Sequence, residues 1–534
     1  MSGMNPSLGR GASDLIDGEW VSLEAGQRGA GSPVESKNPA RPGEVVWSGC
    51  SRLEHVEAAV AAARRALPEW SRWPRERRFA VLRRFAKLCE ARAERVAGLI
   101  CDEVGKVLWD AKQEAAALPA KVEITLEDGG PLKRVSDWEV SLGGTKVGRT
   151  WFRPHGVMAV VGPYNFPAHL PNGHIVPALA MGNTVVLKPS DKAPAVGQML
   201  IELLQEALAA EGAPGGVVNL VQGGADVAKR LVSHEGLDGI LFTGSWPVGR
   251  AIMEANLDRP GRILALEMGG NNAAVVMPDA DLRQAAIEVV RSAFVTSGQR
   301  CTCTRRLIVH EAIADRFVSA VCKAASNLIV GDPRASHPVF MGPMISEGAR
   351  RAVLEFQGRA AGGGGEVLVE ATAMDVGGGG WYVTPGVMRV EKFVSREARQ
   401  RDSEGARQRG SIEAGEDVEV FGPLLRVAVV KGLDEAIEQA NATRYGLAAS
   451  IFTKDEGTVR RFCDEVRAGC INVNTGTAGA SSKLPFGGLG LSGNHRPAGA
   501  FSLDYCAYPV AGMVEGSNAA AVPPGMRFED GWVR

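Results

Sequence analysis

The chain has 534 residues, which is more than one ordinary hydrophobic core accommodates, so its length predicts two or three domains. Hydrophobic residues make up 45% of it and charged residues 23%, as in globular proteins, and the net charge of -1 argues against a nucleic-acid partner. No apolar run reaches the ~18 residues of a membrane span. The nine irregularly spaced cysteines are typical of a reduced, cytoplasmic protein without a structural zinc site.

The first third of the chain predicts a loose start, then helices, then a hairpin. Residues 1–15 are rich in Gly and Ser and lack an apolar run. Apolar residues recur at helical spacing over 51–70 and 75–100. Residues 138–153 alternate apolar and polar side chains on either side of Gly143-Gly144, which predicts a β-hairpin.

From residue 156 onward, short apolar runs alternate with helical stretches. The runs that predict buried strands are 157–161, 184–187, 217–221 and 239–242, and further strands are predicted near 273–277, 306–310, 424–430 and 469–474. A strand, helix, strand rhythm of this kind predicts parallel sheets, and two such regions predict two α/β domains with a cleft between them.

Two segments depart from this rhythm. Residues 395–411 are charged and contain no large apolar residue, so they predict a solvated insertion that buries no surface. Residues 515–534 are rich in Ala, Pro and Gly, and we expect them to be loose.

Cys301 is the first candidate for chemistry. It lies in the segment SGQRCTC (297–303), directly after an apolar helical stretch. The thiolate is the reactive form of cysteine, so a nucleophile needs a lowered pKa, and Arg300 is the adjacent positive charge. Gly298 allows the backbone to approach a ligand closely. A lone cysteine is more often buried and inert, and Cys303 is expected to be a spectator.

Three further segments follow buried strands. Glu267 lies between an apolar strand and Gly269-Gly270, where poor solvation raises a carboxyl pKa and suits it to general-base work. Asn165 lies in the turn GPYNFP (162–167), where a fixed amide could stabilise an oxyanion. The turn FTGSWPVG (242–249) opens a helix, whose free N–H groups could bind a phosphate. Taken singly, each segment is more typical of a structural role.

In combination, these motifs resemble the aldehyde dehydrogenase superfamily. In chain order they read PYNFP, LKPSD, FTGS, LEMGG, GQRC, VEVFGP and PFGG, and the resemblance covers roughly residues 16–512. It implies NAD(P)-dependent oxidation of an aldehyde to a carboxylic acid. Cys301 would form a thiohemiacetal and then a thioester, Asn165 with the Cys301 N–H would hold the oxyanion, and Glu267 would activate water.

The resemblance also implies a cofactor site and no metal site. The residues that match it are Lys188, Ser190, Asp191, Gly244, Ser245, Gly249, Glu419 and Phe421. Lys188 would bind the adenine-side ribose, Glu419 the nicotinamide ribose, and residues 244–245 the pyrophosphate. A carboxylate at Asp191 can accept a ribose hydroxyl and would repel a 2′-phosphate, so we expect NAD, with NADP possible.

Within the superfamily, the chain resembles the N-succinylglutamate 5-semialdehyde dehydrogenases of arginine catabolism. The segments that carry this resemblance are HLPNGH (169–174), EMGGNN (267–272), GQRCTC (298–303), SGNHRP (492–497) and DYCAYP (504–509). It implies an anionic aldehyde, so we expect cations at the site. The candidates are His169, His174, Arg300, Lys483 and Arg496. The 395–411 insertion, Trp246-Pro247 and the C-terminal tail depart from this subfamily.

The implied fold is the α/β aldehyde dehydrogenase fold. We expect a Rossmann-like nucleotide-binding domain from 16–137 and 156–266, an α/β catalytic domain from 267–476, and a β oligomerisation arm from 138–155 and 477–514. The open edges of such an arm need a partner strand, so we expect a homodimer or homotetramer.

Three alternatives stay open at this point. A CoA-acylating aldehyde dehydrogenase would release its product to CoA, although such enzymes generally lack a glutamate at the Glu267 position. A non-catalytic member of the family would have lost Cys301, Glu267 or Asn165, and all three are present. A thiol hydrolase without redox chemistry would leave Lys188 and Glu419 without a role.

Overall fold

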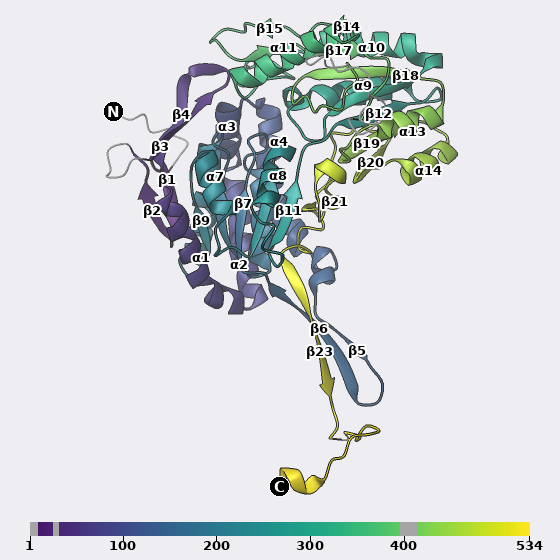
Figure 1. The fold of residues 1–534 in the computed structure, drawn as a ribbon. Helices are drawn as coiled ribbons and strands as arrows, with labels where there is room; N and C mark the ends of the chain where they lie inside the picture. The colour runs from purple at the N-terminus through teal and green to yellow at the C-terminus, as the bar shows by residue number, and fades with distance from the viewer. Residues whose placement is uncertain (1–8, 25–30, 396–413, 519) are drawn as a thin grey trace.

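The structure is a computed structural model that describes residues 9–24, 31–395, 414–518 and 520–534 (Figure 1). The predicted 395–411 insertion lies outside the described residues except for Ser395. Two seven-stranded sheets occupy separate halves of the molecule, and a three-stranded arm extends away from both (Figure 1). In the described part of the chain, no helix is long and apolar enough to span a bilayer.

The first sheet has the strand order β11-β10-β7-β8-β9-β1-β2. Its parallel strands are β7 (Val157–Val161), β8 (Thr184–Lys188), β9 (Val218–Leu220), β10 (Gly239–Thr243) and β11 (Ile263–Glu267), and β1 (Ser13–Ile16) and β2 (Glu19–Ser22) extend it in antiparallel fashion. Strands β7, β8 and β10 are buried along their whole length, as expected for parallel strands covered on both faces.

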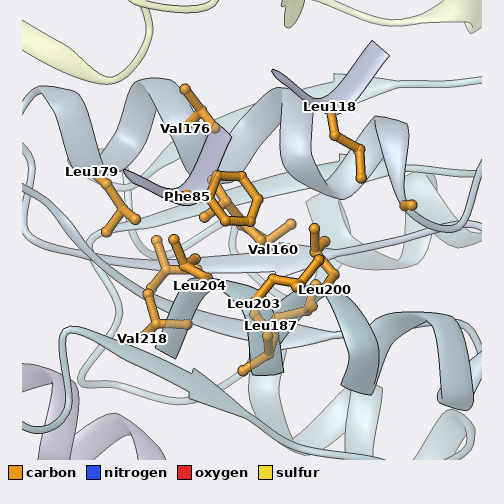
Figure 2. Packing of buried hydrophobic residues seen from close by; sticks show 14 of the residues in the cluster. Phe85, Leu118, Val160, Val176, Leu179, Leu187, Leu200, Leu203, Leu204 and Val218 are labelled. Carbon is orange, nitrogen blue, oxygen red and sulfur yellow. The ribbon is translucent and has the colours of Figure 1, made fainter. Parts of the chain in front are cut away.

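Helices pack on both faces of this first sheet. They are α1 (Glu54–Arg72), α2 (Arg75–Ala91), α3 (Ala93–Val104), α4 (Leu108–Leu126), α5 (His169–Ala180), α6 (Pro194–Ala210), α7 (Ala225–Val232) and α8 (Trp246–Glu254). Figure 2 shows Phe85 of α2, Leu118 of α4 and Leu204 of α6 packed with Val160 and Leu187 of the sheet. This core holds α4 and α5 rigidly beside the ends of the strands.

The second sheet has the order β14-β17-β18-β13-β12-β19-β20. Its strands are β12 (Asn272–Val276), β13 (Thr304–His310), β14 (Glu366–Val369), β17 (Gly386–Arg389), β18 (Leu424–Val430), β19 (Ala448–Phe452) and β20 (Cys470–Val473), and only β14 is antiparallel to its neighbour. The helices of this half are α9 (Leu282–Phe294), α10 (Ala314–Ser326), α11 (Glu347–Gly362), α13 (Leu433–Asn441) and α14 (Glu456–Glu465).

The arm combines a hairpin with a distant strand. β5 (Trp138–Ser141) and β6 (Lys146–Pro154) form the predicted hairpin, and β23 (Ala507–Glu515) pairs with the free side of β6. The chain ends beyond the tip of this arm (Figure 1). Smaller pairs complete the fold: β3 (Ser32–Asn38) with β4 (Arg41–Ser51), β15 (Ala373–Met374) with β16 (Tyr382–Val383), and β21 (Pro485–Phe486) with β22 (Ala498–Gly499).

The eight predicted strands are all observed, but the predicted loose start is too long. Ser13–Ile16 form β1 instead of a loose segment. Leu15 is fully buried and pairs with Leu220 of β9, and Asp14 accepts a hydrogen bond from the backbone N–H of Gln222. The strand is stabilised by a partner about 200 residues away, which its own Gly- and Ser-rich surroundings do not indicate.

Candidate active site

Glu267 is the last residue of β11, at the edge of the first sheet that faces the second. Its backbone carbonyl accepts a hydrogen bond from Gly244, and its side chain is only 1% exposed. Neither carboxylate oxygen has a hydrogen-bond partner within the described part of the chain. Burial raises the pKa of Glu267 well above its usual range, and the charge of Arg496 offsets this only partly. The carboxyl group therefore keeps its proton to a higher pH than an ordinary glutamate does.

The loop that carries Cys301 begins with an unusual turn. Three consecutive residues after α9 adopt left-handed backbone: Thr296 at φ 54°, Ser297 at φ 55° and Gly298 at φ 71°. This conformation costs about 1–2 kcal/mol for a residue with a Cβ, and it is rarest for a β-branched one such as Thr296. A Cβ on Gly298 would approach the carbonyl oxygen of Gly422 to 2.2 Å, so only glycine fits there. Strong contacts elsewhere must hold this turn.

Two buried side chains hold the carbonyl groups of this loop. Arg305 donates hydrogen bonds to the carbonyl oxygens of Gly298 and Arg300, at 3.2 and 2.9 Å. Asn272 donates to the carbonyl oxygens of Cys301 and Cys303, at 2.7 and 2.8 Å. The backbone on both sides of the thiol is thus fixed by groups from β12 and β13.

The thiol of Cys301 does not have the lowered pKa that its sequence neighbour predicts. Burial, the nearby carboxylates of Glu267 and Glu419, and Cys303 all raise the pKa of Cys301 well above its usual range, and only Arg305 opposes them. Arg300 is not among the groups that shift the pKa of Cys301, and it pairs with a buried carboxylate on α4, that of Asp110. The expectation that Arg300 lowers this pKa is therefore wrong, and the resting thiol holds its proton.

Asn165 lies against the same loop. Its side-chain amide donates to the carbonyl oxygen of Gln299 at 3.0 Å, and the residue is 7% exposed. Gln299 in turn accepts a hydrogen bond from the backbone N–H of Ile345. The hydrogen bond to Gln299, two residues before Cys301, fixes the orientation of the Asn165 amide group. The second N–H of this amide has no partner in the described structure.

The predicted cofactor residues of the first sheet gather at the carboxyl ends of its strands. Lys188 ends β8, is 5% exposed, and has its pKa lowered to about 8 by burial. Asp191 is half exposed and lies 3.5 Å from the ammonium group of Lys192. The hydroxyl of Ser190 accepts a hydrogen bond from the Lys192 backbone N–H.

The turn after β10 leads directly into α8. Ser245 precedes the helix without capping it through its side chain, so the N–H groups of the first turn remain available to a ligand. A Cβ on Gly249 would approach the sulfur of Met268 to 2.3 Å, so glycine lets α8 pack closely against the site. Pro247 lies in the first turn of α8, where proline is well tolerated, so the Trp246-Pro247 departure leaves the helix start intact.

Glu419 lies on the other side of the site. Its carboxylate accepts hydrogen bonds from the backbone N–H of Gly270 at 3.0 Å and from Arg305 at 3.3 Å, and burial still raises its pKa. The ring of Phe421 contacts Tyr164 edge-on, with 6.2 Å between centroids. A carboxylate that is both buried and oriented by two donors is well suited to bind a hydroxyl group of a ligand.

The two histidines proposed as cations are neutral in the structure. Burial together with three nearby cations lowers the pKa of His169 to about 4, and its Nδ1 atom has no hydrogen-bond partner within the described residues. His174 bonds to the hydroxyls of Tyr505 and Thr243, and burial lowers its pKa to about 3. The expectation that these imidazoles provide positive charge is therefore wrong.

The remaining candidates differ in how much charge they can offer a ligand. The charge of Arg300 is compensated by Asp110, at 2.7 Å. Arg496 is half buried, donates to the carbonyl oxygen of Gly488 at 3.0 Å and lies near Glu267. Lys483 is exposed. Of these candidates, Arg496 is the one whose charge acts on Glu267.

Several residues that build the site carry no signal in the sequence. Arg305 and Asp110 belong to no motif, and Asn272 ends the EMGGNN segment without any sign there of its contact with the Cys301 loop. Asp110 lies in the first turn of α4. Their contacts cross from one element to another, so only the folded chain brings them to the loop of Cys301. No cluster of His, Cys, Asp or Glu in the described ranges is arranged to hold a metal ion.

Comparison with known proteins defines the class of this chain. The model of the aldehyde dehydrogenase family matches residues 27–399 and 415–509, so the chain belongs to that family and is an oxidoreductase that acts on aldehydes. This confirms the resemblance seen in the sequence.

Individual relatives are similar over nearly the whole chain. An N-succinylglutamate 5-semialdehyde dehydrogenase of Sphingopyxis alaskensis is 43% identical over 92% of this chain and 96% of its own, and one of Hahella chejuensis is 40% identical over 96% and 99%. Among solved structures, an indole-3-acetaldehyde dehydrogenase in complex with NAD+ has a TM-score of 0.84 at 28% identity, covering 95% of this chain and 97% of that one. An NADP-dependent glyceraldehyde-3-phosphate dehydrogenase from Bacillus halodurans, complexed with NADP, has a TM-score of 0.82 at 28% identity, covering 95% and 100%.

Proposed function

We propose that this protein oxidises N-succinylglutamate 5-semialdehyde to N-succinylglutamate with NAD(P), as a step of arginine catabolism. The names of relatives that are 40–43% identical over most of their length support this substrate. The observation that carries the chemistry is that two proton-holding groups, the Cys301 thiol and the Glu267 carboxyl, lie within electrostatic reach of each other, since Glu267 helps to raise the pKa of Cys301.

In the proposed mechanism, Cys301 is the nucleophile and Glu267 the base. Glu267 acts once it has lost its own proton: its carboxylate takes up the proton of the thiol and releases it to solvent, and the thiolate attacks the aldehyde carbon to form a thiohemiacetal. The Asn165 amide and the Cys301 backbone N–H stabilise the oxyanion. Loss of hydride leaves a thioester, which water activated by Glu267 then hydrolyses to the carboxylic acid.

The cofactor residues fit a dinucleotide on three sides. When bound, NAD(P) supplies the hydride acceptor. Lys188 would bind the adenine-side ribose, the free N–H groups at the start of α8 would bind the pyrophosphate, and Glu419 would accept a hydrogen bond from the nicotinamide ribose. Asp191 favours NAD over NADP because its carboxylate would repel a 2′-phosphate. Relatives of this fold bound to NAD+ and to NADP support both cofactors.

A substrate panel tests the proposal. N-succinylglutamate semialdehyde should show a higher kcat/KM than glutamate semialdehyde, succinate semialdehyde and neutral aldehydes, each assayed with NAD and NADP and with and without CoA. Preference for another aldehyde would overturn the substrate, and a CoA thioester product would overturn hydrolysis. The variant Cys301→Ala should lose oxidation completely, whereas Cys303→Ala should keep it.

We also propose that the arm assembles the chain into a homodimer or homotetramer in the cytoplasm. Trp138 and Val140 of β5, with Leu142 just after it, expose apolar surface on the arm. β5 is an edge strand of the arm, and its unpaired edge suits a strand from a second copy. All cysteines in the described ranges are free, which suits a reducing compartment. Light scattering of the wild-type chain and of Val140→Lys tests this assembly, and a monomeric wild type would contradict it.

A further inference from the structure

Three side chains form a closed ring of hydrogen bonds directly before Cys301. Asp110 of α4 accepts from the hydroxyl of Thr296 at 2.6 Å and from Nη2 of Arg300 at 2.7 Å. Nε of Arg300 donates to the same Thr296 hydroxyl at 2.8 Å, which closes the ring. The Asp110 side chain is 2% exposed and that of Arg300 is 15% exposed, so water competes little with these contacts.

The ring encloses the strained part of the loop. It begins at Thr296, whose backbone is left-handed, and it ends at Arg300, the residue bonded to Cys301. The intervening Ser297 is tied separately, through its hydroxyl, to the carbonyl oxygen of Gly342. A β-branched residue keeps a left-handed backbone only where its surroundings impose it, and the hydroxyl of Thr296 is where Asp110 acts on this turn.

The same helix also holds the turn that carries Asn165. One helical turn after Asp110, the carboxylate of Glu114 accepts hydrogen bonds from the backbone N–H groups of Ala168 and His169, at 3.0 and 3.1 Å. Lys106 pairs with Glu114 in full burial. Asp110 and Glu114 thus lie on one face of α4 and fix the nucleophile loop and the neighbouring turn against a single rigid element.

We propose that Asp110 is a positioning residue that sets the place of Cys301 through Thr296 and Arg300. This inference rests on the proposed role of Cys301 as the nucleophile. It assigns Arg300 to the loop rather than to the substrate, because its charge is compensated by Asp110 and its Nε atom is engaged by Thr296. Asp110 touches neither the thiol nor the reacting atoms, so it acts only through the geometry of the loop.

Variants that change one side chain of the ring at a time test it. Asp110→Asn keeps the shape of the side chain and removes its charge, Thr296→Val removes only the hydroxyl, and Thr296→Ser retains it. We expect kcat to fall roughly 10- to 100-fold in the first two, as misplacement of a reacting group by about 1 Å would produce, with the KM for the cofactor within about twofold of wild type. Thr296→Ser should retain near wild-type kcat.

The alkylation of Cys301 by iodoacetamide, followed on its own peptide by mass spectrometry across pH, reports the loop independently of turnover. In Asp110→Asn and Thr296→Val the released thiol should reach water, so the pH midpoint of alkylation should move down toward that of an ordinary cysteine. The variant that combines Asp110→Asn with Thr296→Val should have a kcat only slightly lower than that of either single variant, because both substitutions disrupt the same ring. Asp102→Asn is the matched control, since Asp102 pairs with Arg334 and contacts nothing in the loop.

Two results would overturn the proposal. One is that the Asp110→Asn and Thr296→Val variants both fold and both keep the kcat and the alkylation profile of the wild type. The other is a fall in kcat with an unchanged alkylation profile, since the carboxylate would then act somewhere other than on the thiol. Failure of the proposed function can be told apart from failure of this inference. A Cys301→Ala variant that still oxidises aldehydes would refute the role of Cys301 as nucleophile. The alkylation profile would still report whether Asp110 holds the loop.

Discussion

The two sides of the site are built in opposite ways. Around Cys301, backbone carbonyls and a strained turn are held by Arg305, Asn272 and Asp110. At the end of β11, the carboxylate of Glu267 is equally buried and has no hydrogen-bond partner in the described structure. The difference fits the two proposed roles. The proposed nucleophile is held in place by hydrogen bonds to its loop, and the proposed base has none that would hinder it from taking up and releasing protons.

The largest effect should come from removing the base. Glu267→Gln keeps the shape of the side chain but cannot accept a proton, so we expect the steady-state rate to fall by about 10²- to 10³-fold. A burst of NADH should precede this slow phase if the thioester accumulates. In the wild type, whose Glu267 pKa is raised, the rate should increase with pH as this carboxyl loses its proton.

Stopped-flow absorbance of NADH measures both phases. Glu419→Gln is the control, because that carboxylate is oriented by Gly270 and Arg305 and is proposed to bind the cofactor, so its loss should raise the KM for NAD more than it lowers the hydrolysis rate. An unchanged steady state in Glu267→Gln would exclude this residue as the base.

On the fixed side of the site, Arg305→Lys should weaken the fold. Arg305 is buried and donates to four carbonyl oxygens and to Glu419, whereas lysine has only three donors. We expect the free energy of unfolding to fall by about 2–3 kcal/mol in urea titrations. The exposed pair of Arg92 and Glu206 provides the comparison, and Arg92→Lys should change stability by less than about 1 kcal/mol. Equal losses of stability in Arg305→Lys and Arg92→Lys would contradict the conclusion that Arg305 holds the Cys301 loop.

The unpaired carboxyl should also lower stability at alkaline pH. The pKa of Glu267 is raised in the folded state, so the unfolded chain releases this proton first, and stability falls as pH rises from the usual glutamate pKa to the folded one. Glu267→Gln should therefore melt above wild type at pH 8, because glutamine has no charge that burial disfavours. The difference should vanish near pH 4. A variant less stable than wild type at pH 8 would mean that the carboxylate has a partner.

The smallest effect should come from the exposed edge of the cofactor site. Asp191 is about half exposed, so its repulsion of a 2′-phosphate is screened. Asp191→Ala should lower the ratio of kcat/KM for NAD over NADP by about fivefold or less. Asp226 also acts on Lys188 through its charge, so Asp226→Ala shows whether the change is specific to position 191. A ratio that stays constant in Asp191→Ala would remove this residue from cofactor selection.

The fold was largely predictable because buried parallel strands are continuous apolar runs, and runs such as 157–161 and 184–187 are unmistakable. The motifs around Asn165, Glu267 and Gly244 were visible because each follows such a strand, whereas the Cys301 motif follows an apolar helix, α9. The charges of the site were not predictable. His169 and Arg300 looked like cations, but burial removes the charge of the first and Asp110, 190 residues earlier in the chain, compensates that of the second. The strand Ser13–Ile16 was missed for the same reason, since its partner Leu220 is distant in sequence.

The arm has a consequence for how the chain is made. β6 pairs with β23 from Pro154 opposite Ala507, so the hairpin leaves the ribosome about 350 residues before the strand that completes its sheet. At translation rates of roughly 5–20 residues per second, this hairpin waits about 20–70 s with one edge open. During that interval both large sheets can form, while the arm cannot. The assembly that we propose for the arm would thereby be delayed until synthesis is essentially complete, and a prematurely terminated chain would lack the strand that completes the arm.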